Sequence, residues 1–414
     1  MSTTRAPLTT GRFLGCVMDP PTRKPAIPYL AILINLQPRF VVTSILPGSL
    51  TSMIMCPRKQ TGDLPTLRDW IEVFRKSIPT FKIHALTDLN VLEELREAAA
   101  HRFGVDFNAA LDALLETPTA PAPGHPDSHP VNCYTLCKLR EDCLHAAGFR
   151  DIFAAVKTAE NDRALQLLPS VIRELDELVG GFSAELELAL RGVFAGNIFD
   201  LGAAASAELH AAGGGAFAST RAQLLPRPWA VDNLDEVLAV VRGTRGARWR
   251  QAALFVDNAG PDVVLGMLPL ARVLLKAGTK VLLMANRGPT INDITAEELV
   301  QLLRQAAELD GLLRMAVASE NIRVVCSGSD LPVIDLTQLS KEAVDATADC
   351  DLIILEGMGR AIETNLYARF TCDSLKLGMI KHPEVAAHFS KRLYDCVCKF
   401  DQAAQQASPV RVKG

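Results

Sequence analysis

The chain has 414 residues, of which 49% are hydrophobic, so it can bury a large core and is not a disordered or fibrous protein. Its 43 basic and 47 acidic residues leave a formal net charge of -4, which gives no general positive field for a nucleic-acid backbone. No membrane partner is expected either, because the apolar segment at residues 29–36 is far shorter than the ~20 residues that a membrane span needs.

Residues 1–64 are expected to form an N-terminal extension that includes a strand at residues 29–36. Residues 1–18 contain Ser, Thr and Arg but no acidic residue, which suits an organellar transit segment as well as a plain tail. The ten cysteines show no regular disulfide framework. We therefore predict a cytoplasmic protein, with an organelle as the alternative.

A mostly helical subdomain is predicted for residues 65–248, because apolar residues recur at helical spacing over 67–115 and again from 136 to about 209. Breaks in the second stretch are expected near Pro169 and at Gly180-Gly181. Residues 117–130 contain five prolines and read as a linker. A zinc site formed by His125, His129, Cys133 and Cys137 is disfavoured, since the prolines prevent one continuous helix there.

From residue 249 to 402, apolar runs of strand length alternate with helical segments such as 262–276 and 296–309. This alternation predicts an α/β domain with a Rossmann-like, doubly wound, mostly parallel sheet, on which the helical subdomain packs. Residues 403–414 are left as a tail. The predicted strands are Ala252–Val256, Val281–Ala285, Ile322–Cys326, Leu352–Leu355, Leu377–Ile380 and Tyr394–Lys399.

Polar residues follow the predicted strands at the sheet edge where ligands bind in open parallel sheets. Asp257 and Asn258 follow the first of these strands, and Asp293 lies in the loop after the second. Their oxygen atoms suit a hard divalent ion such as Mg²⁺ or Mn²⁺, so these three residues are the predicted metal ligands. Each of them taken alone also reads as a turn or helix-cap residue, and only their convergence favours the metal site.

The remaining strand ends supply parts that phosphoryl transfer needs. Arg360 can bind a phosphate with two hydrogen bonds and Lys381 adds a point charge, so both are predicted to act in catalysis together with Asp257. Whether Asp257 attacks phosphorus or only binds the ion stays open at this point. The predicted substrate-binding residues are Gly260, Asn286, Glu356, Gly357, Met358, Gly359, Arg360 and Lys381.

Three segments make the sequence similar to a known family: residues 255–260, residues 286–295, and the string Glu356-Gly357-Met358-Gly359-Arg360. They resemble the damage-control phosphatases, and the last string resembles the hallmark of the second subfamily, which includes a phosphatase domain fused to a pantothenate kinase paralogue and stand-alone plant relatives. The resemblance covers roughly residues 65–400. It also implies that Asn161, Asn197 and Asp200 support the metal site, for which helix capping is the alternative.

The resemblance implies a divalent cofactor, either Mn²⁺, Co²⁺, Ni²⁺ or Mg²⁺, and hydrolysis of phosphate monoesters of damaged or surplus metabolites. For this subfamily the expected substrates are 4'-phosphopantetheine and its oxidised, sulfonate-type forms, whose removal limits their entry into coenzyme A. Alternatives are a sugar-phosphate phosphatase of the same family and a non-catalytic regulator that binds phosphopantetheine. A nucleotide-binding transferase or a methyltransferase is disfavoured because residues 252–261 lack a Gly-x-Gly-x-x-Gly loop, and homo-oligomerisation is left open.

Overall fold

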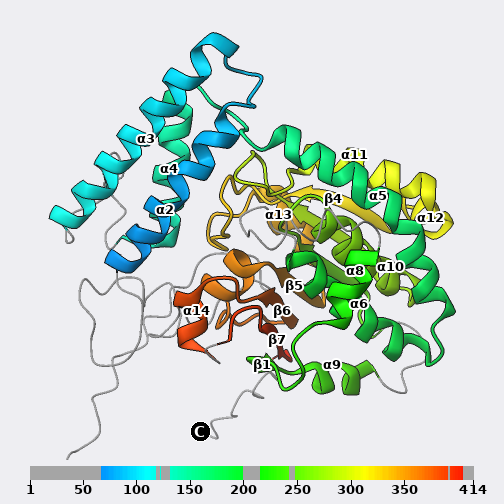
Figure 1. The fold of residues 1–414 in the computed structure, drawn as a ribbon. Coiled ribbons are helices and arrows are strands. Elements are labelled where there is room, and N and C mark those ends of the chain that lie inside the picture. Colours follow the sequence, from blue (N-terminus) through cyan, green and yellow to red (C-terminus); the bar gives the residue numbers. More distant parts are fainter. Residues whose placement is uncertain are drawn as a thin grey trace, which may run out of the picture. The chain divides into compact units, whose positions relative to one another are not determined.

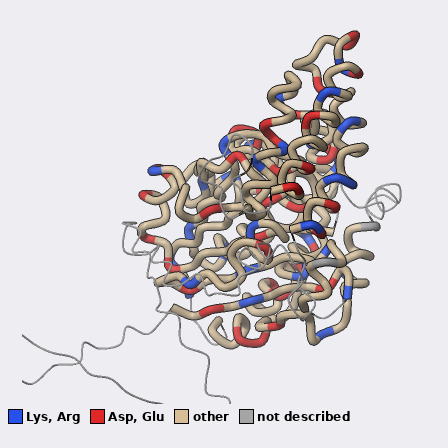
Figure 2. The backbone as a smooth tube through the Cα atoms, turned by 90° about the vertical axis from the view of Figure 1, so that its left-hand side faces the viewer, with Lys and Arg blue, Asp and Glu red and all other residues tan. Residues whose placement is uncertain are grey.

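The computed structural model describes residues 67–117, 122, 131–198, 215–241, 248–389 and 392–403. The strand expected at residues 29–36 and the proposed transit segment lie outside these residues, as does most of the linker at 117–130. Within the described part, no helix combines the length and the apolar character needed to cross a membrane. Acidic and basic residues are interspersed along the backbone in the view of Figure 2.

Helices and strands alternate along the second half of the chain, as predicted, and helices dominate the first half (Figure 1). The helices are α2 (Leu67–Ala85), α3 (Glu93–Glu116), α4 (Cys133–Ala147), α5 (Ala154–Glu177), α6 (Gly181–Ile198), α8 (Gly215–Ala222), α9 (Leu234–Val241), α10 (Leu268–Lys276), α11 (Ala296–Leu309), α12 (Gly311–Ala318), α13 (Lys341–Thr347) and α14 (Pro383–His388), with π-helices η1 (Asp262–Met267) and η2 (Met358–Glu363). The strands are β1 (Val231–Asp232), β2 (Gln251–Phe255), β3 (Lys280–Ala285), β4 (Ile322–Cys326), β5 (Leu352–Glu356), β6 (Asp373–Met379) and β7 (Cys396–Asp401).

The strands form one seven-stranded sheet in the order β1-β7-β6-β5-β2-β3-β4. All neighbouring pairs are parallel except β6 and β7, which are antiparallel, so the prediction of a mostly parallel sheet is confirmed. After β2 the chain adds β3 and β4 on one side, and it then returns to add β5 on the other side. The strand order therefore reverses between β2 and β5, and the crevice at such a reversal is where ligands bind in this class of sheet.

Both faces of the sheet are covered by helices, because successive strand residues point to opposite sides. Leu254 and Leu283 pack in one core with α5, α6, α10 and α11, whereas Phe255 and Met284 pack in a second core with α2, α3, α4 and η2. Helices α2, α3 and α4 lie side by side in Figure 1. Helices α6, α9, α10 and α11 therefore contact the strands on one face, and α13 and η2 contact them on the other, whereas α2, α3 and α4 pack mainly on one another.

Two local details differ from the sequence prediction. Pro169 lies inside α5 and does not break it, because buried Leu165, Leu168 and Ile172 anchor the helix on both sides of the proline and offset its cost of ~3 kcal/mol. Strand β6 begins at Asp373, four residues before the predicted start. The domain boundaries at 65, 249 and 402 remain predictions; β1 lies within the range expected to be mostly helical and pairs with β7.

Candidate active site

The polar residues that follow β2 and β5 meet at the reversal point of the sheet. Since the two strands are paired neighbours, the residues after them leave the same edge side by side. The backbone N–H of Asp257 donates a 3.0 Å hydrogen bond to Glu356 Oε2. Glu356, predicted as a substrate-binding residue, is thus tied directly to the predicted metal ligand Asp257.

A group of three buried carboxylates lies here: Asp257, Asp262 and Glu356, which we call the acid group. Each residue offers one oxygen that lies within 4.8 Å of those of the other two. Their exposed fractions are 7%, 2% and 0%. Three carboxylates this close and this buried repel one another, so a cation among them would be strongly stabilising.

Two amide side chains hold the acid group together. Asn258 Nδ2 donates to Asp257 Oδ2 at 3.1 Å and to Asp262 Oδ2 at 2.8 Å. Asn197 Nδ2, from the end of α6, donates to Asp262 Oδ2 at 3.1 Å and to Glu356 Oε1 at 2.9 Å. Asn197 therefore contacts this site, as the family resemblance implied, and does not cap a helix.

Asp262 was missed in the sequence analysis, which took residue 262 only as the first residue of a helix. An acidic residue in the first turn of a helix is ordinarily explained by the helix dipole, so the residue type alone does not indicate a site. The available signal was its position, since Asp262 lies four residues after Asn258 on the same strand-to-helix connection.

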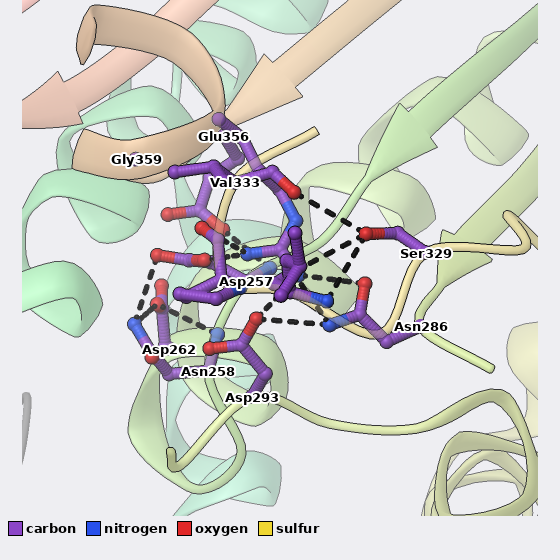
Figure 3. Close-up of polar contacts among 12 residues, drawn as sticks. Asp257, Asn258, Asp262, Asn286, Asp293, Ser329, Val333, Glu356 and Gly359 are labelled. Carbon is purple, nitrogen blue, oxygen red and sulfur yellow. Dashed lines mark hydrogen bonds and ion pairs between the residues drawn. The ribbon is translucent and has the colours of Figure 1, made fainter. Parts of the chain in front are cut away.

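Asp293 and Asn286 lie beside Asp257 (Figure 3), and Arg360 joins this network next to the acid group. Arg360 Nη1 forms an ion pair with Asp257, and Arg360 Nη2 lies 2.6 Å from Asp293 Oδ2 and 3.0 Å from Asn286 Oδ1. Asn286 Nδ2 also donates to Asp293 Oδ2 at 3.1 Å. The guanidinium group is buried among these acids, so its role as a direct phosphate ligand stays a prediction.

The structure thus brings together Asp257, Asn258 and Asp293, the three predicted metal ligands. Asn258 and Asp293 also form an isolated backbone bridge. One oxygen of Asp293 is engaged by Arg360 and Asn286, whereas the oxygens that converge in the acid group come from Asp257, Asp262 and Glu356. The predicted ligand set is therefore adjacent to, but not the same as, the carboxylate set that the structure gathers.

Burial raises the pKa of Asp257 and of Glu356 well above the ordinary carboxyl values, and it raises the pKa of Asp262 as well. The positive charge of Arg360 opposes this rise at Asp257 but does not cancel it. Asp262 Oδ1 is buried and has no hydrogen-bond partner among the residues that the structure describes. A divalent cation fits this arrangement, because it would pair with the unsatisfied oxygen and favour the ionised carboxylates.

Glycines allow the close approach of the backbone on both sides of the acid group. Gly357 has φ +100°, and a Cβ at this position would overlap the carboxylate of Asp257. Gly260 has φ +77°, and its Cβ would lie 2.8 Å from Glu160 Cβ, while its N–H donates to Asn161 Oδ1 at 2.7 Å. Gly260 and Asn161 therefore attach the loop after β2 to α5, and substrate contact by Gly260 stays a prediction.

A cavity of about 520 Å³ opens beside the site, a size typical of small-molecule pockets. Asp257, Asn258, Met358, Gly359 and Lys381 line its polar end. Lys381 Nζ donates to the backbone oxygen of Asn197 at 2.9 Å, which places a cation next to the acid group. Apolar side chains from α2 form much of the remaining wall, namely Trp70, Val73, Phe74 and Phe81.

The remaining residues that were singled out from the sequence either lie outside the described residues or are buried. Asp200, His125 and His129 lie outside the described residues. Cys133 and Cys137 are buried on α4, and both line the cavity. Cys396 and Cys398 are buried in β7 and pack in the core.

Comparisons with known proteins agree with this description. A family model described as the damage-control phosphatase ARMT1-like domain matches residues 73–397. A damage-control phosphatase of Arabidopsis thaliana is 44% identical over 346 residues, covering 84% of this chain and 90% of that protein. A 4'-phosphopantetheine phosphatase of Mus musculus is 30% identical over 64% of this chain and 38% of its own length. The chain also superposes on the solved structure of a DUF89 family protein from Pyrococcus horikoshii, with a TM-score of 0.53 and 18% sequence identity. The match covers 79% of this chain and 96% of the other chain, so the two proteins share a fold.

Proposed function

This chain belongs to the damage-control phosphatase family, and we propose that it is a metal-dependent phosphatase acting on 4'-phosphopantetheine and its oxidised, sulfonate-type forms. The observation that carries the proposal is the acid group, with its unsatisfied Asp262 oxygen, at the polar end of a cavity beside Lys381. Such activity would limit the entry of these compounds into coenzyme A.

The acid group would hold the divalent ion, with Asn258 and Asp293 as further oxygen donors within the same network. An ion such as Mn²⁺, Co²⁺, Ni²⁺ or Mg²⁺ bound there would polarise the phosphoryl oxygens and offset their negative charge. This assignment extends the set expected from sequence by Asp262 and Glu356.

The protein's own cations have separate roles in this proposal. Lys381 lines the cavity and offsets the charge that develops on the departing phosphate. Arg360 forms ion pairs with both Asp257 and Asp293, and its planar, forked guanidinium group fixes the orientation of the two carboxylates. Arg360 is therefore proposed to act mainly as a positioning residue.

The cavity supports a substrate that is longer than a simple phosphate ester. Its volume of about 520 Å³ and its apolar wall from α2 suit a phosphate carried on an extended, largely uncharged arm, as in phosphopantetheine. The name of the Mus musculus relative points to the same compound. A sugar phosphate would leave much of the apolar wall without contact, so it is the second candidate substrate.

The direct test incubates the purified protein with Mn²⁺ or Co²⁺ and a panel of phosphopantetheine forms, sugar phosphates and p-nitrophenyl phosphate, and measures released phosphate. We expect turnover of phosphopantetheine forms that depends on the added metal and is lost in Asp257→Asn. Preferential turnover of sugar phosphates would select the second candidate. Tight binding of phosphopantetheine with no turnover by any metal-loaded sample would instead indicate a non-catalytic regulator.

A further inference from the structure

Two cysteines of α4, Cys133 and Cys137, line the cavity and play no part in the chemistry proposed above. They are four residues apart, so their side chains lie on the same face of the helix, one turn from each other. Buried cysteines usually serve as small apolar core residues, as Cys396 and Cys398 do in β7. Cys133 and Cys137 are buried as well, but they differ from that pair because both border a ligand-sized cavity.

The two thiols of α4 interact with each other. A hydrogen bond with Cys137 is the main cause that raises the pKa of the Cys133 thiol well above its ordinary value, and burial adds to the rise. Cys133 Sγ also lies 3.8 Å from Glu363 Oε2, whose negative charge acts in the same direction. Cys133 therefore keeps its proton, and its S–H is a hydrogen-bond donor for the sulfur of Cys137.

Cys137 also has a positive charge nearby. Arg140 follows it by three residues, a spacing that brings two side chains together on a helix. Burial lowers the pKa of Arg140, but the negative charges of Glu141 and of an ionised Cys137 raise it more. A cation and a hydrogen-bond donor beside a thiol favour its thiolate form, which is the form that attacks disulfides. Of the two thiols, Cys137 is therefore the one that is arranged to react.

The pair cannot form a disulfide with itself while α4 is intact. Side chains four residues apart on a helix have Cβ atoms about 5–6 Å apart. A disulfide needs Cβ atoms about 3.5–4.5 Å apart, so the first turns of α4 would have to unwind. A capping box stabilises that end of the helix, since the Asn132 side chain accepts from the Thr135 N–H and the Thr135 hydroxyl accepts from the Asn132 N–H. A sulfur atom that bonds to Cys137 must therefore come from a molecule in the cavity.

We propose that Cys137 is a modification site for small disulfides that enter the cavity. The sulfur of Cys137 attacks one sulfur of the disulfide R–S–S–R, the S–S bond of that molecule breaks, and a mixed disulfide between Cys137 and R–S forms. The other half leaves as the thiol R–SH with the proton of Cys137, so the exchange involves no net oxidation. Because Cys133 cannot displace the group by closing an intrachain disulfide, the adduct stays until an external thiol or reductant removes it.

The adduct blocks the substrate site. The group R–S occupies part of the cavity of about 520 Å³ in which the phosphate ester is proposed to bind. Formation of the adduct does not depend on the proposed function, whereas its effect on activity rests on it. The phosphatase is then inactivated reversibly when small disulfides accumulate.

The test treats the full chain, freed of reductant, with hydroxyethyl disulfide, which is small and uncharged. Peptide mass spectrometry should find one hydroxyethylthio group on Cys137, and a phosphine reductant should remove it. Turnover of p-nitrophenyl phosphate with Mn²⁺, a substrate without a thiol that could reverse the modification, should fall as the adduct forms. In Cys137→Ser this loss, relative to the activity of the same sample before treatment, should be at least about tenfold slower.

Two further variants separate the cavity pair from other cysteines. Cys143→Ser is the matched control, because Cys143 is a partly buried cysteine on the same helix that does not line the cavity. It should gain the adduct and lose activity at the wild-type rate. Cys133→Ala removes the S–H donor, so the adduct should form on Cys137 more slowly than in the wild type.

An absent adduct on Cys137, or one formed mainly on Cys133 or Cys143, would overturn the proposal. Inactivation of Cys137→Ser at the wild-type rate would overturn it as well, since the loss would then arise elsewhere. An unchanged rate of adduct formation in Cys133→Ala would contradict the role assigned to its S–H. If the untreated protein releases no phosphate from any substrate, the proposed function fails, and mass spectrometry alone then decides whether Cys137 is the modification site.

Discussion

Two clusters of buried charge lie on the same sheet, and their composition differs. The acid group sits between β2 and β5, where acids outnumber the adjacent cations and an oxygen of Asp262 stays unsatisfied within the described structure. The second cluster lies on β6 and β7, where Lys376 Nζ contacts Asp401 Oδ2 at 2.5 Å, Ala368 O at 2.7 Å and Ser374 Oγ at 3.3 Å. Lys399 also pairs with Asp401, at 2.6 Å.

The comparison separates charges that build the fold from charges that await a ligand. Around Lys376 the carboxylate and its cations satisfy one another, so this cluster needs nothing further. In the acid group, burial raises the pKa of all three carboxyl groups, and the neighbouring cations do not cancel this rise, so the protein alone stabilises the ionised carboxylates incompletely. Perturbed carboxyl groups with a specific cause, next to a cavity, are a recognised mark of a functional site.

Replacing an aspartate by asparagine should lower activity at the acid group but stability at the second cluster, and the largest effect is expected at the acid group. Asp257→Asn should lower kcat/KM, measured by phosphate release, by about three orders of magnitude, which is about 4 kcal/mol of barrier. Because one negative charge is removed from an acid-rich cluster, urea unfolding without metal should change by no more than about 1 kcal/mol. Near-normal metal-dependent activity in this variant would contradict the site assignment.

Asp401→Asn is the matching change in the second cluster. It leaves buried Lys376 without its carboxylate, so the free energy of unfolding should fall by about 3 kcal/mol near pH 7, while kcat per folded molecule stays within about twofold. Burial lowers the pKa of Lys376 to about 8 in the folded wild-type protein, so above pH 8 the amine is largely neutral and its pair with Asp401 contributes less to stability. The loss caused by Asp401→Asn should therefore shrink as pH rises through about 8, which denaturant titrations at pH 7 and 9.5 will check.

A divalent ion should stabilise the folded protein by way of the acid group. At a free Mn²⁺ concentration of 100 times its Kd, the expected gain is about 2.7 kcal/mol, measured as a rise in Tm and reversed by chelation. Because burial raises the carboxyl pKa values, the metal-free folded state binds more protons than the unfolded state above the ordinary values of 3.8 and 4.5. Metal-free stability should thus decrease as pH rises from there, and metal affinity should increase. A Tm that does not respond to Mn²⁺ would contradict the cation site.

Asp262→Asn should have the smallest effect of these variants, a loss of metal affinity, and it best distinguishes the acid group from the metal ligands predicted from sequence. If the ion binds in the acid group, its Kd by calorimetry should rise about tenfold, or about 1.4 kcal/mol. Asp293→Asn is the comparison, because Asp293 is paired with Arg360. A larger loss of affinity in Asp293→Asn than in Asp262→Asn would favour the set expected from sequence, Asp257, Asn258 and Asp293.

The sequence predicted the strands best where burial matched apolar composition. Strands β2, β3 and β4 lie within a residue of their predicted ranges, since their apolar runs fill both cores. The start of β6 was missed because Asp373, Ser374 and Lys376 are polar yet buried, satisfied by contacts such as the 2.9 Å bond from Trp249 Nε1 to Asp373. Pairing between residues so distant in the chain has no local signal.

The active-site residues likewise divide into those that the sequence predicted and those that it did not. The approach of Asp293 and Arg360 to Asp257 was expected, because polar residues at the ends of parallel strands must share one edge. Asp262 was hidden, since its position in a first helical turn already has an ordinary explanation. The engagement of Arg360 by acids, and the cavity wall from α2 and α4, depend on side-chain packing between segments far apart in sequence.

The π-helices η1 and η2 that follow β2 and β5 have a consequence for insertions and deletions. Each π-turn contains one residue more than the α-turn it replaces, and such turns are frequent at functional sites. Removing a single residue from either would leave an α-turn in its place but would rotate the side chains on one side of the deletion by ~100° relative to those on the other. Asp262 in η1, or Arg360 in η2, would then leave its partners while the helix itself became more regular. Deleting one residue from η1 or η2 should therefore give a folded protein that lacks the phosphatase activity. A related chain that is one residue shorter in either segment should be examined for this shift of Asp262 or Arg360 before an activity is assigned to it.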